Sequence, residues 1–325
     1  MKRRIISAAV LMGFACLGLA GCQSDEYTRQ ELNITEDTYE ITAWKEELPD
    51  QTDYSINADY IRGISIEDNG QEVFTVSYEP QDYKEAYDYW EVSVPYDSSV
   101  TPNTEELYNL FENLAAIRLT EDTSGITFDE AGLTDTARKV CLALTSDGSD
   151  APDSMLRLSV GSEDGSGNYY ASLAGSDQVF IFPGSAVDAL FGINPFEYIL
   201  KIPVLVDTKT VSSIEISQGD KLYTMSVGDQ GYVMDGHEVE EDEYNETYVK
   251  LLDVFIKEEL PEEESVSEDT QPLLDIRFFR NTDDVSDVEI SYYPYDDESA
   301  VISVNGAQYF LANLEDVENL ADEFF

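Results

Sequence analysis

Residues 61–80 have the sequence IRGISIEDNGQEVFTVSYEP, in which two runs of alternating apolar residues flank a polar Asn-Gly turn. Apolar residues with a period of two predict β-strands, and Asn-Gly between two such runs predicts a hairpin. Residues 211–230, VSSIEISQGDKLYTMSVGDQ, have the same pattern around a Gly-Asp turn. Because one hairpin pattern occurs in both halves of the chain, the sequence predicts a duplicated unit.

Both copies continue in the same order after the hairpin. A third strand is predicted at residues 89–97 and 231–239, and a strand–turn–strand–helix segment at 169–191 and 300–322. A helix is predicted after each third strand, because apolar residues recur there with helical spacing. These residues are Leu107, Leu110, Phe111 and Leu114 in the first copy, and Tyr248, Leu251, Leu252 and Phe255 in the second.

The ends of these helices carry capping signals. Asn103 with Glu106 predicts a capping box at the first helix. Ser185 and Asn313 are the predicted N-cap residues of the final helix in each copy. Helix starts are therefore predicted at matching places in the two copies.

The predicted fold class is α+β, with two tandem repeats of mainly antiparallel sheet and helices packed on one face of each sheet. The first α+β repeat is predicted over residues 58–203 and the second over 204–325. Within the second, the acidic stretch 258–272 is predicted to be a loop or a mobile linker.

The start of the chain has the pattern of a bacterial lipoprotein signal. A basic start, MKRR, precedes an apolar run over residues 5–19, and Leu-Ala-Gly precedes Cys22. We expect a signal peptide over residues 1–21, lipidation of Cys22 and a flexible acidic leash over 22–57. The predicted location is the extracytoplasmic face of the bacterial cell membrane, where the lipid on Cys22 holds the protein. An ordinary signal peptide is the alternative.

The chain carries 68 acidic and 18 basic residues. This excess of negative charge argues against a nucleic-acid partner, because binding phosphate requires basic patches. It favours solubility through mutual repulsion of the chains. A cationic partner and weak calcium binding are the alternative interpretations.

The sequence lacks the residue patterns of the common catalytic and cofactor sites. His237 is the one histidine, and we expect it to be exposed in a turn. Cys141 lies in an alternating apolar run and is expected to be a buried small residue. We therefore predict that the protein is not an enzyme, and that it uses no cofactor and no metal site.

A tyrosine-rich stretch follows the first hairpin. Aromatic side chains with a polar tip are favoured at protein interfaces. The stretch contains Tyr78, Tyr83, Tyr87, Tyr89, Trp90 and Tyr96, of which Tyr83, Tyr87, Tyr89 and Trp90 are the candidate partner-binding residues. The alternative is a long hairpin whose rings pack against one another.

Two segments, FDEAGLTD (128–135) and LRLSVGSEDGSGNYYASLAGSDQVFIF (156–182), give the chain a resemblance to a known family. The sequence resembles the bacterial family of domains of unknown function numbered 4340, over most of residues 60–200 and more weakly in the second copy. The residues that carry the resemblance are Gly132-Leu133, Val160-Gly161, Tyr169-Tyr170-Ala171 and Val179-Phe180-Ile181.

The resemblance implies a membrane-anchored protein whose gene lies near those of an ABC transporter of the gliding-motility type. It implies no catalytic residues. We therefore expect a non-catalytic accessory or scaffold protein of an envelope complex, with ABC transporter subunits as partners. A surface lipoprotein that binds glycans or peptides is the alternative, and an envelope hydrolase using paired carboxylates is a third class.

Overall fold

The computed structural model describes residues 45–48, 51–54, 57–81, 84, 89–122, 124–134, 138–145, 147–228, 231–261, 264–267, 269–281 and 287–325. Contacts between Cα atoms divide the chain into two compact units. The first unit consists of the chain up to Val76 together with Phe111–Ile193. The second unit consists of Ser77–Leu110 together with Asn194–Phe325. A two-stranded antiparallel pair, β1 (Lys45–Leu48) and β2 (Gln51–Tyr54), precedes the two main sheets.

The first main sheet has eight strands in the order β5-β4-β3-β7-β8-β9-β10-β6. Its strands are β3 (Ile61–Asp68), β4 (Gln71–Tyr78), β5 (Trp90–Val94), β6 (Thr120–Glu121), β7 (Arg138–Leu144), β8 (Ser154–Glu163), β9 (Tyr169–Leu173) and β10 (Phe180–Phe182). Its helices are α3 (Thr104–Ala116) and α4 (Gly184–Phe191).

The second main sheet has nine strands in the order β14-β13-β12-β11-β16-β17-β18-β19-β15. Its strands are β11 (Val211–Gln218), β12 (Lys221–Gly228), β13 (Gly231–Met234), β14 (His237–Val239), β15 (Ile256–Glu259), β16 (Leu274–Arg280), β17 (Val288–Pro294), β18 (Ser299–Val304) and β19 (Ala307–Asn313). Its helices are α5 (Glu241–Lys250) and α6 (Leu314–Asp322).

The two sheets have the same order of connections. Each begins with a hairpin (β3–β4 or β11–β12) and adds a third strand beside it (β5 or β13). A helix then leads to a short strand at the opposite edge (β6 or β15), and four adjacent strands and a last helix complete the copy. The second copy adds β14. The predicted α+β fold of two tandem repeats is therefore confirmed.

The repetition extends to the turn with which each copy begins. One-turn 3-10 helices, η1 (Ala58–Tyr60) and η4 (Thr208–Thr210), precede β3 and β11. The side chains of Asn57 and Asp207 cap these turns, each accepting a hydrogen bond from the backbone N–H two residues later. Directly after these turns, the pairing of β3 with β7 and the pairing of β11 with β16 each shift in register. Both sheets therefore start with the same local geometry.

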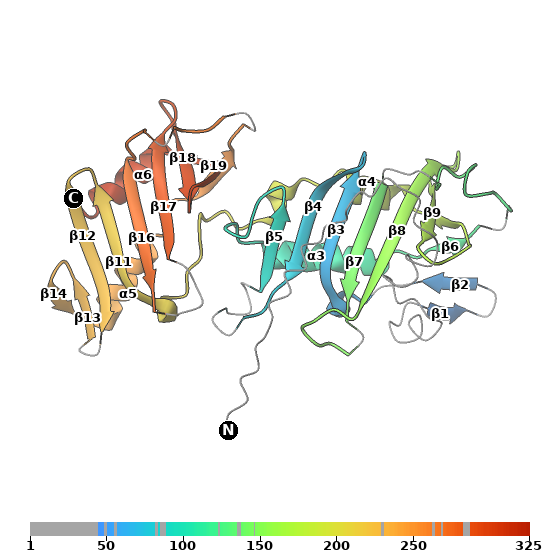
Figure 1. Ribbon diagram of the computed structural model, residues 1–325, viewed down its shortest axis with the longest axis horizontal. Helices are drawn as coiled ribbons and strands as arrows, with labels where there is room; N and C mark the ends of the chain where they lie inside the picture. Colours follow the sequence, from blue (N-terminus) through green and yellow to red (C-terminus); the bar gives the residue numbers. More distant parts are fainter. Residues whose placement is uncertain are drawn as a thin grey trace, which may run out of the picture. The chain divides into compact units, whose positions relative to one another are not determined.

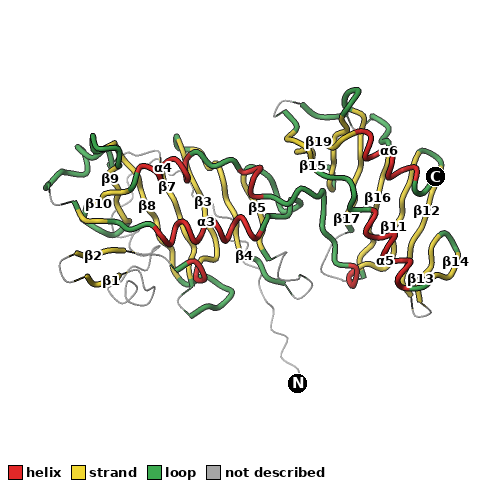
Figure 2. Tube along the Cα trace, turned by 180° about the vertical axis from the view of Figure 1, so that it is seen from behind, coloured by secondary structure: helices red, strands yellow, loops and turns green. Residues whose placement is uncertain are grey.

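The helices cover one face of each sheet. Figure 1 shows α3 and α4 behind the first sheet and α5 and α6 behind the second, and the reverse view in Figure 2 brings them to the front. The four apolar residues predicted to line one side of α3 (Leu107, Leu110, Phe111 and Leu114) are all buried. Burial of each such side chain contributes about 1.5–3 kcal/mol, so this face holds α3 against its sheet.

The predicted second helix is shorter than its apolar spacing indicated. The helix α5 buries Tyr244 and Tyr248 but ends at Lys250. The chain then turns toward β15, and Phe255, which was predicted to lie on the buried helical face, is 53% exposed. The need to reach the sheet edge at Ile256 therefore overrides the local helical pattern.

Two of the three predicted caps are found in the positions expected. The Asn103 side chain accepts hydrogen bonds from the backbone N–H groups of Glu105 and Glu106. The other half of the predicted capping box is wrong, because the Asn103 N–H donates to the Tyr198 carbonyl and the Glu106 carboxylate accepts from Asn109. Asn313 occupies the N-cap of α6, although its side chain donates to the Asp316 carboxylate instead of accepting from the backbone. The prediction for Ser185 is wrong, because the N-cap of α4 is Pro183, two residues earlier, and Ser185 lies inside the helix.

Candidate functional site

Four aromatic side chains pack together where β4, β5 and α3 meet, and we name them the aromatic cluster: Tyr78, Tyr89, Trp90 and Tyr108. The Tyr78 ring centroid lies 5.7 Å from that of Tyr89 and 5.2 Å from that of Trp90. The centroids of Trp90 and Tyr108 are 6.4 Å apart. All three pairs meet edge to face, the arrangement that the charge distribution of aromatic rings favours.

The members of the cluster differ in their exposure to solvent. Trp90 is 2% exposed and forms the floor, whereas Tyr108 is 38% exposed. Tyr78 and Tyr89 are intermediate. The exposed part of the cluster is therefore made of tyrosines above a buried Trp90, and the partner-binding role of these residues stays a prediction.

An ion pair lies next to the cluster in the sequence. Lys84 Nζ is 2.6 Å from Glu91 Oε1, and the Lys84 side chain is only 8% exposed. A charge this well covered requires a partner, because removal of an ammonium group from water is costly. Glu91 supplies that partner from β5, beside Trp90.

A second carboxylate, Glu79, lies at the end of β4. Its backbone N–H donates to the carbonyl of Tyr89 at 2.6 Å. Burial raises the pKa of Glu79 above its ordinary value of 4.5, and the nearby Glu91 raises it further. Ser77 and Lys84 oppose this shift by stabilising the ionised form, without cancelling it.

The raised pKa of Glu79 predicts a pH-dependent effect on stability. A group whose pKa is raised on folding favours the folded state most at low pH, and that contribution is lost as the pH rises through the folded-state pKa. We expect Glu79→Gln to raise the free energy of unfolding at pH 7 by a few tenths of a kcal/mol, since water screens a part-exposed carboxylate. Chemical unfolding at pH 7 and near pH 4 checks this. A gain that persists unchanged at pH 4 contradicts it.

The structure brings only part of the predicted tyrosine site together. Tyr89 and Trp90 are members of the aromatic cluster, whereas Tyr83 and Tyr87 lie outside the described residues. Sequence reasoning missed Tyr108, although its position had a signal. Tyr108 lies outside the helical spacing of the buried residues Leu107, Leu110, Phe111 and Leu114, so it is an aromatic residue on the polar side of the amphipathic helix α3.

The two residues considered for catalysis, Cys141 and His237, belong to different sheets. Cys141 is buried in β7, as expected, and the Arg157 side chain donates to its sulfur at 3.4 Å. His237 is exposed at the start of β14, directly after the turn at Asp235-Gly236. Among the described residues, no group of three or more His, Cys, Asp or Glu side chains is arranged to hold a metal ion. Cys22 lies outside the described residues, so its lipidation stays a prediction.

The motifs that carry the family resemblance meet at one end of the first sheet. Val160, Ala171 and Phe180 are direct neighbours across β8, β9 and β10, and all three are completely buried. The Ser162 N–H donates to the Ala131 carbonyl at 2.8 Å, which fixes the segment containing Gly132 against β8. These motifs therefore form part of the core and the connections of the first sheet.

A small apolar cluster covers the equivalent end of the second sheet. It contains Leu260, Val301 and Leu311, with Val266 packed against it. The Val266 N–H donates to the Gln308 side chain at 2.8 Å. Of the two interpretations of residues 258–272, the loop therefore fits the described part, because β15 and these contacts hold it to the sheet.

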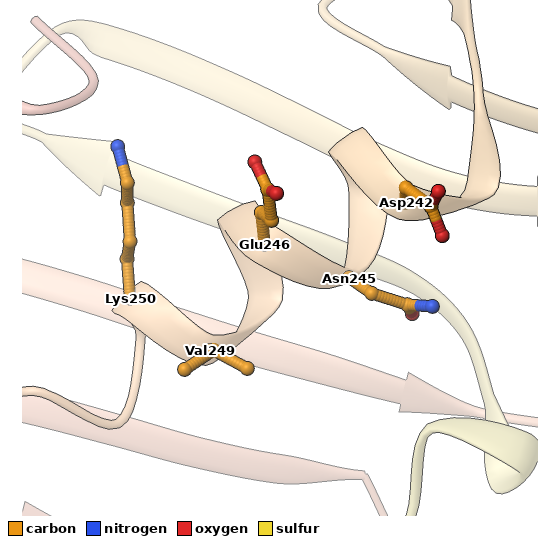
Figure 3. Close-up of a pocket in the computed structure, with 5 residues that line it drawn as sticks. All are labelled: Asp242, Asn245, Glu246, Val249 and Lys250. Carbon is orange, nitrogen blue, oxygen red and sulfur yellow. The ribbon is translucent and has the colours of Figure 1, made fainter.

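A second surface feature lies along the outer side of α5 and continues to α6. One hollow of about 580 Å³ is lined by Asp242, Asn245, Glu246, Val249 and Lys250, as Figure 3 shows. An adjoining hollow of about 240 Å³ is lined by Lys250, Asp253, Asp316, Asn319, Leu320 and Glu323. Because Lys250 borders both hollows, we treat them as one feature, the α5–α6 groove.

These features define a two-repeat α+β protein with helices on one face of each antiparallel sheet. The family described as Domain of unknown function (DUF4340) matches residues 90–270, more than half of the 325 residues, and the chain belongs to this family. The match begins at β5 and extends into the second repeat, farther than the resemblance over residues 60–200 indicated. No curated protein matches the chain, and no solved structure matches it. In the part of the chain that the structure describes, no helix is long and apolar enough to cross a membrane.

Proposed function

We propose that this protein is a non-catalytic, lipid-anchored extracytoplasmic protein that acts as an accessory or scaffold of an envelope complex. The signal-like start and Cys22 support the anchor and the location. Two acyl chains on one cysteine hold a protein at a membrane, since each buried CH₂ contributes about 0.8 kcal/mol. Loss of membrane association in a Cys22→Ser variant, measured by fractionation, tests this step. Unchanged association contradicts it.

The aromatic cluster is the observation that carries the binding role. Tyr78, Tyr89 and Tyr108 present polar-tipped rings around the buried Trp90. Because Trp90 packs against Tyr78 and Tyr108, and Tyr78 packs against Tyr89, the rings lose little conformational entropy when a partner covers them. Tyrosines held in this way are typical of the side chains that dominate interface energies.

The expected partner is an ABC transporter in the same membrane. This part of the proposal rests on the family resemblance alone. Purification of the lipidated chain in mild detergent, followed by mass spectrometry of the proteins that accompany it, tests the association. Transporter subunits are expected in the purified complex. Repeated recovery of the lipoprotein without any transporter subunit removes this partner from the proposal.

The contribution of the cluster to partner binding has a direct test. We expect Tyr89→Ala combined with Tyr108→Ala to weaken partner recovery by at least about tenfold, since a hot-spot tyrosine contributes more than about 1 kcal/mol and each 1.4 kcal/mol is a factor of ten. Leu222→Ala is the control, because it shortens a 55% exposed side chain on β12, outside the cluster. Equal recovery with the double variant and with the control assigns the partner to a different surface.

The alternative function is a surface lipoprotein that binds glycans or peptides. The observation that favours it is the backbone pairing of Glu79 with Tyr89, at 2.6 Å from Glu79 N to the Tyr89 carbonyl oxygen, which sets an acidic residue opposite an aromatic one. Sugars stack on aromatic faces, and carboxylates accept hydrogen bonds from their hydroxyl groups. A rise in the unfolding temperature with cell-wall glycan fragments or peptides supports this function. The rise must disappear in the Tyr89→Ala, Tyr108→Ala variant.

A further inference from the structure

The outer side of α5 combines negative charge with an exposed apolar residue. The helix packs on its sheet through Tyr244 and Tyr248, which leaves the opposite side to solvent. There Val249 is 57% exposed, between residues that carry charge. Valine stabilises an exposed helix position less than most residues do, so helix stability does not account for it.

The groove that continues from α5 to α6 is strongly acidic. Its described lining carries five carboxylates (Asp242, Glu246, Asp253, Asp316 and Glu323) and one ammonium group, that of Lys250. Lys250 Nζ already lies 2.6 Å from Glu323 Oε2, and this contact is the main reason that the pKa of Lys250 is raised. The described lining of the groove therefore has four more carboxylates than ammonium groups.

The aliphatic parts of the groove lie between these carboxylates. Val249 lines the hollow on α5 and is exposed, whereas Leu320, which lines the hollow that reaches α6, is only 4% exposed, so Val249 supplies the apolar contact. In Figure 3, Val249 and Lys250 project from the same turn of α5 toward different sides, with Glu246 one turn earlier. Apolar contact and negative charge are therefore offered within one surface.

We propose that the α5–α6 groove docks a basic segment of a partner protein, in which Lys or Arg side chains meet the groove carboxylates and an apolar side chain covers Val249. Charge complementarity selects this occupant, because an acidic groove repels the acidic copies of its own chain. The formal charge of −50 on the whole chain adds long-range attraction for a basic partner. The contact with Val249 requires an apolar side chain at one position of the partner segment, which long-range attraction alone does not require.

The test uses the full lipidated chain in mild detergent and, as probe, a synthetic amphipathic peptide of lysine and leucine. Binding is measured by fluorescence anisotropy at about 50 and 200 mM NaCl, since salt screens exposed charges. We expect Glu246→Gln combined with Asp253→Asn to weaken binding about fivefold at low salt. We expect Val249→Thr, which keeps the shape of the side chain but adds a hydroxyl, to weaken it about threefold at both salt concentrations.

The control variant removes the same amount of charge elsewhere on the surface. Glu112→Gln combined with Glu318→Gln changes exposed carboxylates of α3 and α6 that do not line the groove. We expect less than a twofold effect from this pair, and no effect from Tyr108→Ala, because the aromatic cluster shares no residue with the groove. Equal losses in the groove pair and the control pair overturn the proposal, since the peptide then senses only overall charge.

Two further outcomes also overturn it. If acetylation of the peptide lysines leaves binding unchanged, charge does not drive the contact. If Ca²⁺ alone binds the wild-type chain, displaces the peptide and no longer binds the Glu246→Gln, Asp253→Asn variant, the groove is a divalent-cation site. A binding loss confined to the groove variants, together with salt sensitivity, supports a basic protein segment as the occupant.

Discussion

Trp90→Ala is expected to lower the free energy of unfolding by about 3–5 kcal/mol, the usual cost of removing a large buried aromatic side chain. Trp90 is only 2% exposed, and its ring meets those of Tyr78 and Tyr108 at 5.2 and 6.4 Å. Alanine leaves a cavity beneath both tyrosines, and it also removes two edge-to-face contacts. Chemical unfolding of the full chain, followed by circular dichroism, measures the change.

Comparison with Tyr108→Ala separates the floor of the cluster from its surface. Tyr108 is 38% exposed, so its removal is expected to cost less than about 1 kcal/mol. Trp90→Phe, which retains a ring, should fall between the two alanine variants. If Trp90→Ala proves no more destabilising than Tyr108→Ala, Trp90 does not support the cluster as we describe. Unlike Trp90→Ala, Tyr108→Ala is expected to weaken partner recovery with only a small loss of stability.

Most strands and their order along the chain were predictable because the pattern that specifies them is local and repeated. The short edge strands β6 and β15 were not predicted, and the single strand predicted at 231–239 is wrong, because a turn at Asp235-Gly236 divides it into β13 and β14. The Asn69-Gly70 turn has positive φ angles of 51° and 74°, a conformation that favours Asn and Gly, and it joins β3 and β4 as expected. The second copy then provided an independent instance of the same arrangement. Because the same pattern occurs twice in the chain, each copy supports the strand prediction for the other.

Helix ends were less predictable, since they depend on where the chain must go next. The spacing of Tyr248, Leu251 and Phe255 is helical, yet α5 stops at Lys250. The N–H of Leu251 bonds to the carbonyl of Tyr248, three residues earlier, which is the tighter hydrogen bonding common at helix ends. A periodic pattern therefore located the helix but not its last turn.

The candidate site was predictable in composition and not in arrangement. The density of tyrosines near Trp90 was evident in the sequence, but the separation into a buried floor and a tyrosine surface depends on α3. Tyr108 belongs to that helix and is brought to Trp90 only by packing. The burial of Lys84 against Glu91 is similarly a tertiary feature, because neither residue has a distinctive local pattern.

Gly161→Ala is expected to destabilise the first repeat by about 2–3 kcal/mol, through overpacking against backbone atoms. A Cβ atom on Gly161 would lie 2.2 Å from the carbonyl oxygen of Ala131 and 3.1 Å from the carbonyl carbon of Gly132. Neither atom can move away by side-chain rotation. The Ala131 oxygen also accepts the hydrogen bond from Ser162, so its displacement strains that bond as well. Glycine at this position is therefore needed for close approach.

Gly228→Ala is the matched control for this substitution, since no described heavy atom lies within 4 Å of its Cβ position and its φ is not positive. Both glycines lie in strands, and both changes reduce the entropy of the unfolded chain by a similar amount, which stabilises by about 0.4–1 kcal/mol where the site has room. We expect Gly228→Ala to leave the thermal unfolding midpoint unchanged or slightly higher, and Gly161→Ala to lower it by about 5–10 °C. Equal midpoints for the two variants would show that the segment around Ala131 yields freely, and that the packing of the family motifs does not hold this end of the sheet together.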